Sequence, residues 1–267
     1  MVKKISQKIY LGLVVLFLYA PILVLIVLSF NASKSRSKWG GFTFDWYKKL
    51  FANQEIMDTL YTTLIIAFLS ALIATIIGTA ASIGINSMRR APRAIMMGIT
   101  NIPMLNADIV TGLSLMILFV VLKNSLGLQM FNLGFTTVLI SHITFNIPYV
   151  ILSVMPRLRQ TNKSTYEAAL DLGASPIHAF VKVVMPDILP GVLSGFLLAF
   201  TMSLDDFIIT HFTRGPVINT LSTKIYSQVR KSISPEWYAL STLLFLSVLL
   251  LLIIINRRND KMQKQHI

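Results

Sequence analysis

Three aspartates lie within apolar stretches of the chain. Asp205 and Asp206 are found in AFTMSLDDFIITHFTRGP, and Asp108 follows Pro103 and Asn106 in NIPMLNADIVTG. A carboxylate at the centre of a bilayer costs about 2.5 to 3.5 kcal/mol on insertion scales, and less near the interface. Such residues usually face a cavity or a partner. Carboxylates at separate positions suit an extended polycation better than an anion or a neutral sugar.

The alternative is that the aspartate pair marks the outer water interface. Asp205 and Asp206 lie about 16 residues, or roughly 24 Å, into one apolar run, and Asp108 about 14 residues, or roughly 21 Å, into another. Adjacent helical residues point about 100° apart. We therefore expect only one of Asp205 and Asp206 to face a pathway, while the other holds a neighbouring helix or subunit.

Aromatic side chains supply the second half of such a site. Tyr149 and Phe145, four residues apart in SHITFNIPYV, are candidates for cation-π contact with ammonium groups, and Phe207 is a weaker one. Ordinary packing is the alternative for each of them. His142, in the same stretch, is expected to hydrogen-bond another helix.

The elements that position these residues are membrane-spanning helices. Of the 267 residues 54% are hydrophobic and 13% are charged, and the mean hydropathy is +0.69. A hydrocarbon core of about 30 Å takes roughly 20 helical residues. The predicted spans are Ile9–Phe30, Leu60–Asn86, Ala94–Leu122 with a break near Pro103, Phe135–Met155, Leu189–Thr210 and Ala239–Ile255. The expected fold is an all-α, six-span membrane protein whose residues 1–267 form a single transmembrane domain.

Several other classes of function find little support. The chain has no cysteine, and its four histidines have no metal-ligand spacing, so no metal site is predicted. The net charge of +13 needs no nucleic-acid partner, since much of it lies where lipid headgroups would meet it. With both termini cytoplasmic, 14 of the 24 Lys and Arg residues fall on the cytoplasmic side, the short SMRRAPR loop among them.

The longest predicted cytoplasmic loop, Pro156 to Ile188, contains STYEAALDLGASPIHAFVKVVMP. Ser164 followed three residues later by Glu167 matches a capping box, and Gly173 is suited to a left-handed helix stop.

The same loop contains signals for a second helix. Ser175 and Pro176 are typical of an N-cap and a first helical residue, and Pro186 is expected to end this helix. Two short helices joined by a glycine turn are thus predicted, which alone is compatible with a structural elbow.

This segment has a pattern of acidic, small, glycine and proline residues at fixed spacing: Glu167, Ala168 and Ala169, then Gly173, then Val183-x-Met185-Pro186. The pattern resembles the EAA loop of ABC-importer permeases, which ends in Ile-x-Leu-Pro, so that Val183 and Met185 are mild apolar departures. The resemblance implies a coupling loop that seats in a groove of a cytoplasmic ATPase. Tyr166 and Leu170 share a helix face that we expect to bury against that partner.

The resemblance extends from about Pro21 to Leu252 and is to the permeases of spermidine/putrescine importers. It rests on SHITFNIPYVILSVMPRL, AFTMSLDDFIITHFTRGP and LSTKIYSQVRKSISPEWYAL. It implies a non-catalytic subunit of the bacterial cytoplasmic membrane that works with a sister permease, two copies of an ATPase and an extracytoplasmic polyamine-binding protein. The chain has no G-x-x-x-x-G-K-[ST] loop, so ATP with magnesium is expected on the ATPase and no cofactor on this chain.

Two alternatives remain open. An ABC permease for another small solute would keep the coupling loop without needing the acids. A secondary transporter would run on an ion gradient, although no internal repeat of the kind that many such carriers show is evident.

Overall fold

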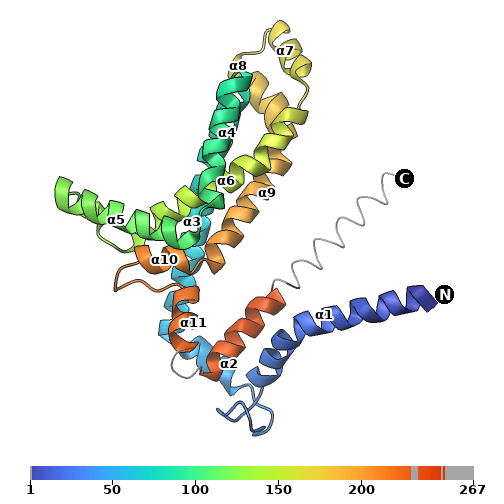
Figure 1. Cartoon of the computed structure of the whole chain (residues 1–267), viewed down its shortest axis with the longest axis vertical. Coiled ribbons are helices and arrows are strands. Elements are labelled where there is room, and N and C mark those ends of the chain that lie inside the picture. Colours follow the sequence, from blue (N-terminus) through green and yellow to red (C-terminus); the bar gives the residue numbers. More distant parts are fainter. Residues whose placement is uncertain (1, 230–233, 248, 250–267) are drawn as a thin grey trace. The chain divides into compact units, whose positions relative to one another are not determined.

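The computed structural model describes residues 2–229, 234–247 and 249, with the side chains of residues 2–6 and 163 left aside. The described residues are nearly all helical, and their only β pairing is an isolated bridge between Asn31 and Phe42 (Figure 1). The helices are α1 Val2–Ser29, α2 Asp45–Ala52, α3 Gln54–Ser87, α4 Arg90–Leu105, α5 Asp108–Leu126, α6 Phe135–Gln160, α7 Lys163–Asp171, α8 Pro176–Ala179, α9 Met185–Asp205, α10 Ile208–Thr213 and α11 Leu221–Val229, with a 3-10 turn η1 at Gln129–Phe131 and a π-helical segment η2 at Phe180–Val184.

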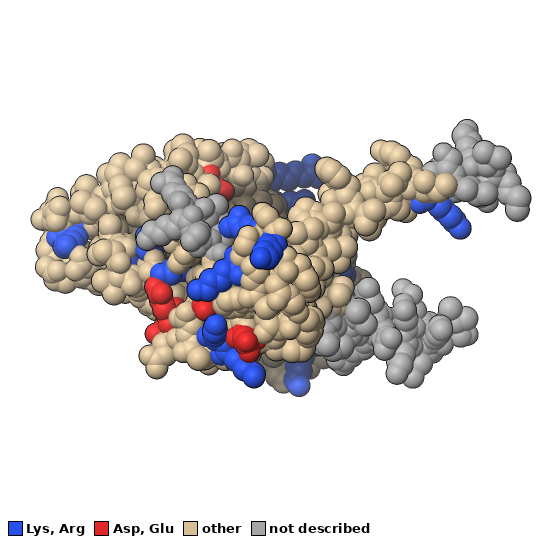
Figure 2. Space-filling model, turned by 90° about the horizontal axis from the view of Figure 1, so that it is seen from below, with Lys and Arg blue, Asp and Glu red and all other residues tan. Residues whose placement is uncertain are grey.

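Five helical stretches are long and apolar enough to cross a membrane: Gln7–Ser29, Gln54–Ser87, Asp108–Leu126, Phe135–Gln160 and Pro176–Asp205. The prediction of an all-α membrane protein is confirmed. The predicted sixth span, Ala239–Ile255, lies partly outside the described residues. On the face seen in Figure 2 the charged side chains are gathered in a few places and most of the surface is uncharged, as a lipid environment requires.

The third predicted span differs from the expectation. The chain breaks at Asn106 and Ala107, whose extended backbone (ψ 148° and 133°) separates α4 from α5, whereas Pro103 lies inside α4. Proline removes one backbone donor, yet the last turn still closes because the Asn106 N–H donates to the Ile102 carbonyl at 3.1 Å. The two helices run in different directions (Figure 1), and α5 alone is long enough to span.

The chain forms two compact units, Thr59–Lys224 and a second one made of Met1–Asp58 with Ile225–Ile267. In the second unit the chain that follows α1 folds around the buried side chain of Asn31. Its amide nitrogen donates to the Lys38 carbonyl at 2.9 Å, and its oxygen accepts the Gly40 N–H at 2.8 Å. Trp46 donates its indole N–H to the Asn31 carbonyl at 2.7 Å, which fixes this loop on α2.

The core of Thr59–Lys224 is built where α3, α6 and α9 meet around Val150, which is fully buried. Glycines permit this close approach. A Cβ at Gly78 of α3 would lie 2.8 Å from the Val150 side chain, and Cβ atoms at Gly191 and Gly195 of α9 would lie 2.9 Å from the Ser153 carbonyl and 3.3 Å from the Val150 Cα. Small residues four apart are typical of close helix pairs in membranes.

A buried polar network ties the same three helices together. The Ser70 hydroxyl of α3 and the Ser203 hydroxyl of α9 lie 2.9 Å apart, and the Asn146 amide of α6 donates to Ser203 at 2.7 Å. All three side chains are buried. Since no water competes for these bonds in a bilayer, the network fixes the register of α9 against its neighbours.

The predicted glycine turn is present, but the first cap differs. Asn162, not Ser164, caps α7, because its side-chain oxygen accepts the Ser164 N–H at 3.0 Å. Gly173 has φ +86°, a left-handed conformation that glycine adopts without strain, as predicted. Ser175 caps α8 with Pro176 in its first turn, which is also as predicted.

Pro186 does not end the second helix of the loop. α8, η2 and α9 form one helical stretch, Pro176–Asp205, so the helix that contains the expected span Leu189–Thr210 begins earlier and ends at Asp205. The wide turn explains how the proline is accommodated: the Met185 N–H bonds the Phe180 carbonyl five residues back. A helix start also tolerates proline, because the first-turn N–H groups need no partner there.

Candidate functional site

A cavity of about 370 Å³ lies where α5, α6, α9 and α10 meet, and it is called here the acidic cavity. Its lining residues are Asp108, Phe145, Tyr149, Met202, Asp205, Asp206, Phe207, Ile208 and Ile209. No Lys or Arg is among these residues. Its volume falls within the usual range for small-molecule sites.

The structure thus brings all five predicted pathway residues into one cavity. Asp108 is the first residue of α5, directly after the break at Asn106 and Ala107. Asp205 is the last residue of α9, and Phe145 and Tyr149 lie one turn apart on α6. Helix ends thus supply the acids of this cavity, and the middle of α6 supplies the Phe145 and Tyr149 rings.

Asp206 is held by protein groups. Its carboxylate accepts the Thr210 N–H at 2.8 Å, the Thr210 hydroxyl at 2.7 Å and the Ile209 N–H at 3.3 Å. It thereby satisfies the free donors at the start of α10.

His142 completes this cluster from α6, as the sequence predicted for it. Its Nε2 lies 2.8 Å from the Thr210 hydroxyl and 3.4 Å from the Asp206 carboxylate. Because the Thr210 hydroxyl gives its proton to Asp206, His142 must be the donor to Thr210. Sequence patterns gave no signal for Thr210, because its role depends on how α10 folds back onto α6.

Asp108 and Asp205 differ from Asp206. Both side chains are exposed, and among the described residues neither forms a hydrogen bond or an ion pair. Their carboxylates are free to meet a cation from solution. Within the described part of the chain, no group of three or more His, Asp and Glu side chains is placed to hold a metal ion.

The floor of the acidic cavity depends on the close packing of α5 against α10. A Cβ at Gly112 would lie 3.2 Å from the Ile209 Cα and 3.1 Å from the Phe212 ring. A larger residue would push α10 away and displace Asp206 with it. Gly112 was not singled out from the sequence, although a glycine inside an apolar helix is a signal of close approach.

The two predicted aromatic candidates, Phe145 and Tyr149, differ in how accessible their rings are. Phe145 is only 8% exposed and packs edge-on against the His142 ring, with ring centroids 5.2 Å apart. Tyr149 is only partly buried. Both line the acidic cavity, but Tyr149 presents the more accessible ring to a ligand.

The predicted coupling segment lies at the other end of α9. On its surface Glu167, Ala168 and Gly173 are exposed, Ala169 is half-buried, and Pro186 is exposed at the start of α9. Two apolar side chains also project into solvent, Leu172 at 90% and Ile177 at 78% exposure.

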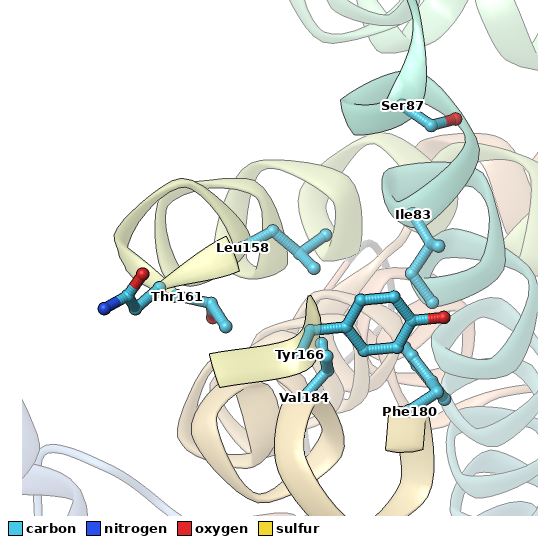
Figure 3. A pocket seen from close by; sticks show the side chains of 8 residues that line it. Ile83, Ser87, Leu158, Thr161, Tyr166, Phe180 and Val184 are labelled. Carbon is cyan, nitrogen blue, oxygen red and sulfur yellow. The ribbon is translucent and has the colours of Figure 1, made fainter. Parts of the chain in front are cut away.

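Tyr166 does not belong to this exposed surface, contrary to the expectation that it buries against a partner. It lines a second cavity, of about 300 Å³, called here the knuckle cavity (Figure 3). The other lining residues are Ile83, Ser87, Leu158, Thr161, Asn162, Phe180 and Val184. Leu170, its predicted companion, is half-buried.

Several apolar helices around a cavity with unpaired charges are the architecture of a membrane transport protein. The chain belongs to the family described as binding-protein-dependent transport system inner membrane component, whose model matches residues 74–263. It is thus a multi-pass membrane permease component.

Named relatives support the same class. The chain is 40% identical over 230 residues to the putrescine transport system permease protein PotI of Escherichia coli K12, covering 85% of this chain and 81% of that protein. It is 38% identical over 237 residues to the spermidine/putrescine transport system permease protein PotC of the same organism, with 89% and 87% covered. The PotC protein of Haemophilus influenzae is 35% identical over 254 residues, with 94% and 96% covered.

Solved structures support the fold. A chain of a bacterial ABC transporter that imports the acidic polysaccharide alginate has a TM-score of 0.66 at 16% identity, with 97% of this chain and 96% of that one covered. A chain of an amino acid ABC transporter has a TM-score of 0.52 at 18% identity, with 81% and 100% covered.

Proposed function

We propose that this chain is the transmembrane permease subunit of an ATP-driven ABC importer that carries polyamines, spermidine or putrescine, into the cytoplasm. The observation that carries the proposal is the pair of free carboxylates, Asp108 and Asp205, which open into one cavity beside the Tyr149 ring. The names of the relatives PotI and PotC point to the same substrates.

The acidic cavity suits a polyamine in charge and in shape. Asp108 and Asp205, on different helices, offer separate partners for ammonium groups at the two ends of a flexible stem. The Tyr149 ring, with Phe145 behind it, receives the methylene stem and a cation-π contact worth about 0.5 to 2 kcal/mol. A neutral solute would leave these carboxylates without a partner once they lose water, which is unfavourable.

Asp206 has a different role in this proposal. Its carboxylate is already used by Thr210, Ile209 and His142, so it positions α10 and does not bind substrate directly. This division agrees with the expectation that one member of the aspartate pair faces the pathway and the other holds a helix.

The proposed assembly contains a sister permease in a heterodimer, two copies of a cytoplasmic ABC ATPase and an extracytoplasmic polyamine-binding protein. ATP and magnesium bind the ATPase, and the chain itself does no chemistry on the substrate. Membership of a binding-protein-dependent family favours this assembly over an ion-gradient carrier. The chain lies in the bacterial cytoplasmic membrane with both termini in the cytoplasm, as the Lys and Arg distribution favours.

The coupling segment transmits ATPase closure in this proposal. Glu167, Ala168 and Ala169 meet the ATPase groove, and small alanine side chains allow a close backbone approach. Leu172 and Ile177 are the apolar anchors of the contact. Gly173 sets the turn between α7 and α8, and Pro186 lies where the segment joins the spanning part of α9.

Uptake of labelled spermidine and putrescine into proteoliposomes tests the proposal. The vesicles contain this chain, the sister permease, the ATPase and the binding protein, and the variant is Asp108→Asn combined with Asp205→Asn. Asp45→Asn is the matched control, because Asp45 is exposed and lies on α2, outside the acidic cavity. We expect ATP-dependent uptake by the wild type and the control, and its loss in the double variant with the assembly intact.

Two other results would contradict parts of the proposal. If uptake survives in the double variant, Asp108 and Asp205 have no binding role, and the alternative interpretation, that they mark the outer water interface, would be favoured. An assembly that hydrolyses ATP but takes up neither polyamine would exclude these substrates and favour an ABC permease for another small solute.

A further inference from the structure

The knuckle cavity lies between the coupling segment and the ends of two spanning helices. Ile83 and Ser87 come from the last turns of α3, and Leu158 and Thr161 come from the end of α6 and the residue that follows it. Its walls are mainly apolar. An apolar cavity of this size leaves side chains on its walls with unused contacts, so they have room to move.

Among the α7 side chains that the structure describes, Tyr166 alone lines this cavity. Figure 3 shows its ring lying among the side chains of Ile83, Phe180 and Val184. The rest of the α7 surface is mostly exposed, and α7 packs against η2 and α8. α7 thus meets η2 and α8 directly, and the Tyr166 ring is the part of it that shares a cavity with Ile83 and Ser87 of α3.

The π-helical segment forms another wall of the cavity. Phe180 and Val184, its first and last residues, both line the cavity. A π turn inside an α-helix holds one extra residue, and such turns occur frequently at functional sites. Conversion of the wide turn to an α turn shifts the register by one residue, which rotates the preceding helix by about 100° relative to the following one.

One helix joins this cavity to the acidic cavity. Val184 closes η2 and lines the knuckle cavity, while Met202 and Asp205 near the end of α9 line the acidic cavity. From Val184 to Met202 the helix rises about 27 Å at 1.5 Å per residue. A displacement at the base of α9 is carried to the carboxylates by a continuous helix.

We infer that Tyr166 is a positioning residue for ATP-driven transport: its ring, held between α3 and η2, converts displacement of α7 into movement of η2 and α9. The inference rests on the proposed function, because it needs an ATPase that moves α7. In this mechanism the empty volume of the knuckle cavity lets the ring shift, and η2 is the element with two registers. The ring and not the hydroxyl performs the task, since no described residue hydrogen-bonds the Tyr166 hydroxyl.

The number of polyamine molecules imported per ATP hydrolysed tests this role. In Tyr166→Ala we expect this ratio to fall at least tenfold, with ATP hydrolysis retained, because α7 still docks but no longer moves η2. Tyr166→Phe should restore the wild-type ratio, since it keeps the ring. Tyr61→Ala is the matched control, because Tyr61 is exposed on α3 and lies outside the knuckle cavity.

A ratio that stays at the wild-type value in Tyr166→Ala, even with both rates reduced, would overturn the inference and make Tyr166 a packing residue. A wild-type assembly without polyamine uptake would instead contradict the proposed function. The two failures are distinguishable because the first is measured relative to a working wild type.

A second measurement leaves Tyr166 intact. The chain has no cysteine, so Ser87→Cys places a single thiol on the wall of the knuckle cavity. We expect its reaction rate with a small maleimide to differ at least threefold between the nucleotide-free and ATP-bound assemblies. Equal rates in the two states would overturn the inference, because the cavity would not change shape with ATP.

Discussion

The acidic cavity and the knuckle cavity differ in chemistry while they differ little in size. Their volumes are about 370 and 300 Å³, and each lies at one end of the same helical stretch, Pro176–Asp205. Three carboxylates line the first, whereas Ile83, Leu158 and Phe180 dominate the second. Charge at one end suits a charged solute, and apolar walls at the other suit the movement of side chains. In the function proposed here, recognition and coupling are therefore separated along α9.

Between the cavities α9 is closely packed against α6, because Gly191 and Gly195 allow the two backbones to approach. Beside the acidic cavity, Ser203 is hydrogen-bonded to both Ser70 and Asn146. A helix fixed in its middle transmits displacement as a rigid body. We therefore expect changes at the two ends of α9 to have separable effects.

The largest effect is expected from Gly173→Pro in the turn between α7 and α8. Proline requires φ near about −65°, whereas Gly173 has φ +86°, so the turn cannot form. We expect transport to fall about a hundredfold while the amount of protein in the membrane is retained, as measured by uptake and immunoblotting. Wild-type transport in this variant would contradict the coupling role.

Alanine at two glycines separates backbone strain from coupling. Gly173 and Gly127 both have positive φ, and an added Cβ at either would meet open space. Each substitution should cost about 1 to 2 kcal/mol of folding free energy. Only Gly173→Ala should lower the number of molecules imported per ATP.

The next effect is expected from Asp108→Asn and Asp205→Asn as single substitutions. Neither carboxylate has a partner among the described residues, so the melting temperature should not change. Loss of one charge-assisted bond of about 1.5 to 3 kcal/mol to an ammonium should lower the uptake rate at limiting substrate by about ten- to a hundredfold. A shift in melting temperature with normal uptake would reverse these assignments.

Asp206→Asn should lower the stability of the protein, whereas Asp108→Asn and Asp205→Asn should lower uptake without changing stability. The substitution weakens the bonds to Thr210 and to His142, and we expect a loss of about 1 to 3 kcal/mol in stability. Thermal unfolding of the detergent-purified assembly measures this loss. The comparison between Asp205 and Asp206 fails if Asp205→Asn destabilises the protein as much as Asp206→Asn.

Tyr149→Leu should raise the KM for spermidine about 2- to 30-fold, the equivalent of a cation-π contact of about 0.5 to 2 kcal/mol. Tyr149→Phe should retain most of the wild-type affinity, because it retains the ring. Phe145→Leu should change KM less, since the Phe145 ring is largely covered by its neighbours. An equal change in the two leucine variants would contradict the difference in accessibility.

The smallest effect is expected from Ser203→Ala, in the hydrogen-bonded network beside the acidic cavity. Hydrogen bonds between membrane helices average about 0.6 kcal/mol, so a small drop in melting temperature is expected. Import per ATP should remain normal. A large change in this ratio would show that this network takes part in coupling.

The sequence was sufficient for local features. Apolar run lengths identified the spanning helices because a bilayer fixes how many residues a span needs. The Gly173 turn and the Ser175 cap followed from backbone chemistry. Asp108, Asp205, Asp206, Tyr149 and Phe145, which line one cavity, could be singled out because polar and aromatic residues are conspicuous in apolar surroundings.

Features that depend on tertiary packing were beyond the sequence. Pro103 suggested a helix break, but the break lies at Asn106 and Ala107, because a proline near a helix end leaves the last turn intact. Pro186 suggested a helix end, but a π turn lets the helix continue. Tyr166 was expected to face a partner, whereas α3 and η2 provide a closer surface.

The central claim is that substrate recognition and ATPase coupling are separated along α9. The most direct test compares Asp205→Asn with Glu167→Lys in the same proteoliposomes, with uptake and ATP hydrolysis measured together. We predict that Asp205→Asn raises the KM for polyamine with ATP hydrolysis still stimulated by the binding protein. Glu167→Lys should abolish stimulated hydrolysis and uptake together, with polyamine binding by the assembly unchanged. Matching losses of binding and of stimulated hydrolysis in both variants would contradict the separation of recognition from coupling.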